Sequence, residues 1–159
     1  MTALRLAFLV ALVPFAGFAE PLLVSPSADY AANNSVPDNI KNECKLPSAQ
    51  TESVLAALTA AGISAQAAPS AAVPAKGRFL KLEITDAISA GSAFVGHKKQ
   101  VTTAAHLFVN GKEVAQTTKT RDSMGGAFGG YRGSCSVLHR CTNTLGKDIA
   151  DWVKTQPGS

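Results

Sequence analysis

The chain has 159 residues, a formal net charge of +4 and 46% hydrophobic residues. This length provides one domain with a single modest core, and after residue 19 no segment is apolar for long enough to cross a membrane. Three cysteines, a small and odd number, exclude a dense disulfide scaffold. Burial of apolar side chains must therefore hold most of the core together.

Residues 1–19 have the pattern of an export signal. Arg5 precedes an apolar run that begins at Leu6. The small residues Gly17 and Ala19 occupy the third-last and last positions before the expected cleavage site, where signal peptidase requires small side chains. The run of 14 residues would span about 21 Å as a helix, which is shorter than the roughly 30 Å hydrocarbon core of a bilayer. We therefore expect cleavage after Ala19 and a soluble exported product, periplasmic in a bacterium or secreted.

The rest of the chain divides by composition. Residues 20–37 mix Pro, Ser, Asn and Ala without periodicity, and we expect a loose N-terminal segment there. We expect a single α+β domain over residues 38–156, because neither half of it is large enough to fold alone. The Ala/Pro-rich stretch at 65–77 is then a surface linker inside this domain.

The domain is expected to begin with a strand and a helix. Ile40, Cys44 and Leu46 fall on one parity within residues 39–46, which is typical of a half-buried strand. A helix is expected from Pro47, with Ser48 as its N-cap and Gly62 as its end.

Three further strands are expected in the middle of the chain. Leu80, Leu82 and Ile84 alternate with polar residues, which predicts a strand. Residues 100–109 and 112–121 flank Asn110-Gly111, the pair that a two-residue type I′ hairpin turn prefers. Pairing across that turn predicts a core face made of Val101, Thr103, Ala105, Leu107 and Val114, with His106 and Phe108 on the opposite face.

The C-terminal segment predicts one long helix from about Ser134 to Lys154. At 100° per residue, one apolar stripe gathers Leu138, Cys141, Leu145, Ile149 and Trp152. We expect Trp152 to be part of the core. The opposite, mostly basic side of the helix carries His139, Arg140, Asn143, Lys147 and Lys154.

The order of these elements is β-α-β-β-β-α. A sheet of three to four mainly antiparallel strands, with two helices packed on one face, buries every apolar stripe described above. The expected fold class is therefore α+β.

The helix also predicts how the cysteines pair. Six residues separate Cys135 from Cys141, about 9 Å at 1.5 Å per residue, and Cα atoms more than roughly 7 Å apart are not bridged. One partner must therefore be Cys44. Cys135, at the first turn, is the easier one to reach, so we predict a Cys44–Cys135 disulfide and a buried free thiol at Cys141.

No motif predicts a catalytic site, a metal site or a cofactor. The glycine-rich residues 125–133 lead into a helix N-terminus but lack the Gly-Lys-Ser/Thr of a phosphate loop, and a connector is the favoured interpretation. His139 lies between Cys135 and Cys141 in sequence but on the other side of the helix, which excludes a joint metal site. No serine stands in a Gly-x-Ser-x-Gly frame.

Charge is distributed unevenly along the chain. Residues 20–75 contain two lysines and five acidic residues, whereas residues 76–159 contain twelve basic and six acidic residues. The candidate binding residues are Lys98, Lys99, Arg132, Arg140, Lys147 and Lys154. Such a basic half favours contact with an envelope protein or an anionic wall or lipid component. The scarcity of aromatic residues argues against nucleic acid, and the oligomeric state is left open.

The chain also resembles a known group of proteins. The features that carry the resemblance are Cys44-Lys45-Leu46 before a helix, the hairpin, the glycine cluster, Gly133-Ser134-Cys135 and the run 148–152. Together they resemble small bacterial cell-envelope proteins of unknown function, many of them lipoproteins. Glu20 stands where a lipoprotein has its cysteine, so the resemblance implies a periplasmic setting and supplies no catalytic residues.

Two classes of function follow. The first is a non-catalytic binding or scaffold module of the cell envelope. The alternative is a small exported enzyme whose site is assembled from residues that lie far apart in the sequence.

Overall fold

The computed structural model describes residues 20–92, 96–123 and 133–156. The predicted export signal therefore lies outside the described residues. The elements in chain order are β1 (Leu22–Val24), β2 (Asp29–Tyr30), α1 (Asp38–Cys44), α2 (Leu46–Ala60), β3 (Ala65–Ala67), β4 (Arg78–Ser92), β5 (Gly96–Val109), β6 (Lys112–Ser123) and α3 (Ser134–Lys154).

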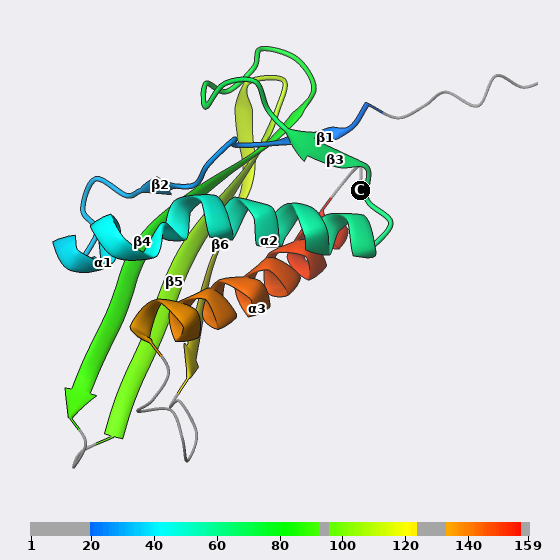
Figure 1. Cartoon of the computed structure of the whole chain (residues 1–159). Helices are drawn as coiled ribbons and strands as arrows, with labels where there is room; N and C mark the ends of the chain where they lie inside the picture. The colour runs from blue at the N-terminus through cyan, green and yellow to red at the C-terminus, as the bar shows by residue number, and fades with distance from the viewer. Residues whose placement is uncertain (1–19, 93–95, 124–132, 157–159) are drawn as a thin grey trace, which may run out of the picture.

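The molecule has an α+β fold in which α2 and α3 cover one face of a mixed sheet (Figure 1). The six-stranded sheet has the order β3-β1-β4-β5-β6, and β2 pairs separately with β4. The β4–β5 and β5–β6 pairs are antiparallel, whereas β1 is parallel to both β3 and β4. The expected class is confirmed, but the expected three to four strands and two helices were too few.

The missing strands lie in segments that we expected to be irregular. β1 and β2 fall within residues 20–37, and β3 falls within the 65–77 linker. Leu22 and Val24 of β1 are almost fully buried, so the expectation of a loose N-terminal segment was wrong. Strands of two or three residues are too short to show alternation. Each is specified only by its partners in the folded sheet, two parallel neighbours for β1 and one each for β2 and β3.

The expected strand at 39–46 was also wrong, because these residues form α1 and the start of α2. Ile40 and Cys44 are four residues apart, so they share a helix face as readily as they share a strand parity. Lys45 adopts the left-handed conformation, at φ 47°, and separates the two helices. Ser48 does not cap α2: its hydroxyl instead donates to the Lys45 carbonyl at 3.1 Å. Gly62, at φ +77°, follows the end of α2 as expected.

The predicted hairpin is confirmed, with one change of register. Asn110 and Gly111 have φ of 50° and 77°, as a type I′ turn requires. A bulge then shifts the pairing, so that Leu107 lies opposite Ala115 instead of Val114. The expectation that Val114 enters the core was wrong, because its side chain is 55% exposed. The other predicted core residues of this hairpin, Val101, Thr103, Ala105 and Leu107, are fully buried.

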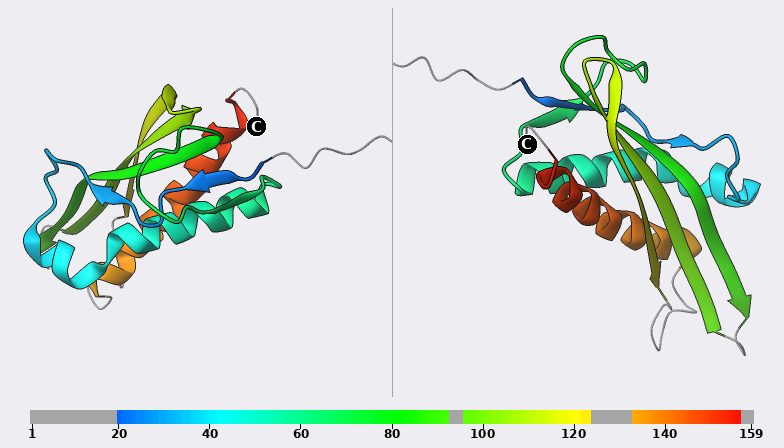
Figure 2. Two further views of the ribbon diagram at one scale, coloured as in Figure 1. Left: turned by 90° about the horizontal axis from the view of Figure 1, so that it is seen from above. Right: turned by 180° about the vertical axis from the view of Figure 1, so that it is seen from behind.

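The C-terminal helix α3 has the predicted bounds and buries four of the five residues of the predicted stripe. Trp152 is only half-buried at the margin of the core, whereas its neighbour Val153 is fully buried. Seen from above and from behind, α2 and α3 lie on the same side of β4, β5 and β6 (Figure 2). The core fills the space between these helices and the sheet.

The predicted disulfide is present between Cys44 and Cys135, with a sequence separation of 91 residues. It joins the last residue of α1 to the first turn of α3. Nearby, His139 Nε2 donates to the Cys44 carbonyl oxygen at 2.6 Å. Cys141 is a buried free cysteine, as predicted, and burial raises the pKa of its thiol.

Candidate functional site

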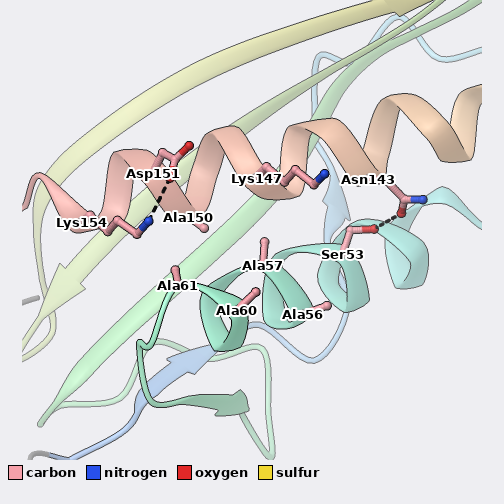
Figure 3. A pocket seen from close by; sticks show the side chains of 10 residues that line it. All are labelled: Ser53, Ala56, Ala57, Ala60, Ala61, Asn143, Lys147, Ala150, Asp151 and Lys154. Carbon is pink, nitrogen blue, oxygen red and sulfur yellow. Dashed lines mark hydrogen bonds and ion pairs between the residues drawn. The ribbon is translucent and has the colours of Figure 1, made fainter.

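A groove of about 570 Å³ runs along the outer side of the helical layer, between α2 and α3 (Figure 3). Its α2 wall consists of Ser53, Ala56, Ala57, Ala60 and Ala61. Its α3 wall consists of Asn143, Lys147, Ala150, Asp151 and Lys154. The side chains of the α2 wall are therefore short and mostly apolar, and the charged side chains stand on the α3 wall.

The groove exists because α2 and α3 point their large apolar side chains toward the sheet and carry short side chains at the outer edge of their contact. The large apolar side chains, among them Leu58 of α2 and Ile149 of α3, point toward the sheet and are fully buried. Residues at the outer edge of the α2–α3 contact are mostly alanines, whose side chains are too short to fill the space between two helices. The helices run in the same direction, so the groove follows both of them (Figures 1 and 3).

One end of the groove is closed by a polar contact. The Ser53 hydroxyl lies 2.7 Å from Asn143 Oδ1, and it also lies 2.7 Å from the Ala49 carbonyl oxygen. Next to this contact, Gly146 allows the helices to approach each other closely. The other end of the groove lies near Ala61 and Lys154 (Figure 3).

The charges on the α3 wall differ in how they are compensated. Lys154 Nζ lies 3.2 Å from Asp151 Oδ1, and both side chains are largely in solvent. Lys147 is exposed, and its ammonium group forms no hydrogen bond or ion pair with any residue that the structure describes. Lys147 therefore places an uncompensated positive charge beside the alanine wall.

The structure brings three of the six predicted binding residues together. Arg140, Lys147 and Lys154 are exposed and seven residues apart, which places them in one row along α3, since seven residues make nearly two helical turns. Lys98 is exposed on β5, away from this row. Arg132 lies outside the described residues.

Lys99 contributes almost nothing to the surface, because it is only 8% exposed. Its ammonium group donates to the hydroxyls of Ser89 and Ser134, which tie β5 to β4 and to the start of α3. The alternation of β5 places Lys99 on the same parity as the buried Val101, a signal that the sequence already contained.

The alanine wall is the part of the site that the sequence analysis missed. Ser53, Ala56, Ala57 and Ala60 recur at helical spacing on α2, but alanines on a helix surface carry no chemistry of their own. They become a groove only beside α3, whose position the sequence does not specify.

Two other charged clusters form ion pairs among their own members, and the one around Arg121 lines another hollow, of about 400 Å³. Arg121 of β6 donates twice to the Asp148 carboxylate, each time at 2.6 Å, and this lowers the pKa of Asp148. On the outer face of the sheet, His106 Nδ1 lies 2.9 Å from Glu113, and Glu83 accepts from Lys81 at 2.7 Å. The hydrogen bond from Lys81 to Glu83 raises the pKa of Lys81.

Two kinds of feature are absent from the part of the chain that the structure describes. No group of three or more His, Cys, Asp and Glu side chains there could hold a metal ion. No helix within the same residues combines the length and the apolar character needed to cross a bilayer.

The fold is similar to that of several solved bacterial proteins. A protein of Xanthomonas campestris from the family DUF330 shares 13% identity, with a TM-score of 0.60, over 91% of each chain. The PelC dodecamer of Paraburkholderia phytofirmans shares 16% identity, with a TM-score of 0.52, over 83% of this chain and 88% of that one. The hypothetical protein CT253 of Chlamydia trachomatis shares 11% identity, with a TM-score of 0.53, over 86% of this chain and 96% of that one.

These identities show a shared fold alone. No family model matches the chain, and no curated protein matches it.

Proposed function

We propose that this chain is an exported, soluble protein of a bacterial cell envelope that acts as a non-catalytic binding module. It binds an acidic partner through the exposed row of Arg140, Lys147 and Lys154 and the groove beside it. The observation that carries the proposal is the uncompensated Lys147 ammonium next to an open, alanine-lined wall.

Three lines support the envelope setting. Residues 1–19 have the pattern of an export signal. The Cys44–Cys135 disulfide is of the kind that persists in oxidising compartments such as the periplasm. The proteins with a similar fold are bacterial.

Binding is favoured over catalysis by where the titratable groups lie. A catalytic site needs an enclosed pocket in which such groups converge. Within the described residues, His106 pairs with Glu113 on the outer face of the sheet, and Arg121 pairs with Asp148 in the lining of a hollow of about 400 Å³, so these groups are already engaged in ion pairs. Half of the residues that line the α2–α3 groove are alanines, and its titratable residues, Lys147, Asp151 and Lys154, all stand on the α3 wall, with only small side chains opposite them on α2.

Capture of a partner from an envelope fraction tests the proposal. The triple variant R140Q/K147Q/K154Q removes the row of charge and should retain less partner than the wild type, because exposed charges steer and hold an acidic surface. The matched control K45Q/K76Q/K112Q removes three exposed lysines elsewhere and should capture normally. Equal capture by the wild type and a folded R140Q/K147Q/K154Q variant would contradict the proposed function.

A further inference from the structure

We propose that the partner segment bound by this groove is an α-helix with a small-residue apolar stripe and acidic residues seven positions apart. This inference rests on the proposed function and adds the chemistry and the shape of the partner. It follows from the length of the groove, its floor and the spacing of its charges.

The length of the groove matches a short helix. Its α2 wall extends from Ser53 to Ala61 and its α3 wall from Asn143 to Lys154. At 1.5 Å per residue these walls are about 12 and about 16 Å long, which corresponds to two to three turns of a helix. Two helices that run side by side leave a straight channel, and a third helix lying along it contacts both.

The floor of the groove favours an apolar stripe with small side chains. Ala56, Ala57 and Ala60 project only methyl groups, so the axis of a third helix can approach to the lower end of the usual 8–10 Å range. An occupant with large side chains on this stripe would be held away from Lys147 and would leave gaps over the alanines.

The charges fix where the acids of the occupant lie. Positions 140, 147 and 154 are seven apart, and each interval spans about 10.5 Å along α3. Glutamates seven apart on a neighbouring helix have the same spacing, as at the flanking positions of a coiled coil. Lys147 lies on the groove wall and Arg140 lies three residues beyond Asn143, so an occupant that continues about one turn past the Ser53–Asn143 contact meets both cations. Asp151, by contrast, repels an acid next to Lys154. We therefore place a glutamate opposite Arg140 and one opposite Lys147, and a neutral residue opposite Asp151.

A pair of synthetic helical peptides provides the probe. Each has 21 residues and the same composition, with a stripe of alanines. In the first peptide two glutamates seven apart border that stripe, and in the second the same glutamates lie on the opposite side of the helix. Calorimetric titration into the folded mature chain should show the first peptide binding about tenfold or more tightly than the second.

Variants of the protein locate the bound peptide. Ala56→Phe fills the middle of the groove from an exposed position and should weaken binding about tenfold or more, whereas Thr59→Phe, exposed on the same helix outside the groove, should not. Ala60→Phe blocks the groove one turn further along and serves as a second test where Ala56→Phe disturbs the fold. Lys147→Gln should weaken binding about two- to fivefold, as expected for one exposed ion pair.

The outcomes separate this inference from the proposed function. Equal binding of the two peptides, or binding that is insensitive to both groove-filling variants, would overturn the helical occupant. Tight binding to anionic phosphatidylglycerol vesicles that Ala56→Phe leaves unchanged would overturn it as well and would assign the basic row to lipid. In each case, loss of envelope capture in R140Q/K147Q/K154Q would still support the proposed function.

Discussion

Gly146 of α3 lies directly against the backbone of Ser53 of α2. A Cβ atom added to Gly146 would come within 2.6 Å of the Ser53 carbonyl oxygen and 2.7 Å of its carbonyl carbon. No real Cβ contact is that short, and the backbone of α2 cannot move aside as a flexible side chain can. The two residues therefore set the distance between the helices at the closed end of the groove.

Gly146→Ala should destabilise the protein although alanine is the better helix former. The propensity gain is about 1 kcal/mol, whereas overpacking typically costs about 1–3 kcal/mol, and here the obstacle is backbone. Urea unfolding of Gly146→Ala measures the balance. Thr144→Ala, on the exposed side of the same helix, keeps the propensity gain without the contact and should be neutral or slightly stabilising. A more stable Gly146→Ala protein would show that the helices are not in contact there.

The bulge next to the hairpin turn predicts opposite outcomes for two apolar residues. Leu107 is fully buried, so Leu107→Ala should lower the free energy of unfolding by about 2–5 kcal/mol. Val114 is 55% exposed, so Val114→Ala should change it by no more than about 0.5 kcal/mol. Denaturant unfolding of both variants tests the register. A large loss in Val114→Ala would mean that the strands pair without the bulge.

Removal of the disulfide should weaken the whole domain, because it closes a loop across most of the folded chain. The bond joins residues 91 apart, and the chain-entropy model gives roughly 4–5 kcal/mol for so long a loop, against a usual loss of about 2–5 kcal/mol. The double variant C44S/C135S, compared with the wild type in oxidising buffer, measures the loss. Dithiothreitol should destabilise the wild type and leave the double variant unchanged. A fragment joining Cys135 to Cys141 in non-reducing peptide mapping would refute both the bond and the continuous α3 helix.

The ion pair between Arg121 and Asp148 should contribute to the free energy of unfolding by an amount that decreases at acid pH. The pKa of Asp148 is lower in the folded state than its ordinary value of 3.8, because Arg121 donates two hydrogen bonds to the charged carboxylate. A group with a lowered folded-state pKa stabilises the fold above its unfolded pKa and loses this contribution as the pH falls through the folded value. The stability difference between the wild type and Asp148→Asn should therefore be full near pH 6 and decrease as the pH falls below 3.8 toward the lower folded-state pKa.

Glu52→Gln provides the matched control for this pH dependence. Glu52 is exposed on α2 and forms no ion pair within the described residues. Urea midpoints at several pH values compare the three proteins. A difference in urea midpoint between Asp148→Asn and the wild type that stays constant from pH 6 to pH 3 would contradict a stabilising ion pair between Arg121 and Asp148.

The long elements of this fold were predictable from the sequence because each carries a complete local signal. The hairpin has Asn110-Gly111 at its turn, and α3 repeats its apolar stripe over about four turns. The disulfide then followed from the geometry of that helix. The short elements had no such signal: Ile40 and Cys44 fit a strand and a helix equally, and β1 depends on neighbours that are distant in sequence.

The candidate site was predictable only on its charged side. Arg140, Lys147 and Lys154 are visible as one row from helical spacing alone. The alanine wall gains meaning only where α2 lies beside α3. A glycine in the middle of a helix is a cost to helix propensity, although in this fold Gly146 is what lets the two helices meet. Packing between helices depends on shape in three dimensions, which a periodic pattern in one chain does not specify.

The central claim is that the exposed cations of α3 bind an acidic partner, and the dependence of affinity on ionic strength tests it most directly. The measurement is the Kd of the wild type for the captured partner, taken from 50 mM to 500 mM sodium chloride. Because exposed charges are screened beyond about 8 Å at physiological salt, we predict that binding weakens steeply over this range and that R140Q/K147Q/K154Q shows a much flatter dependence. A Kd that stays constant with salt, or the same slope for both proteins, would contradict the account.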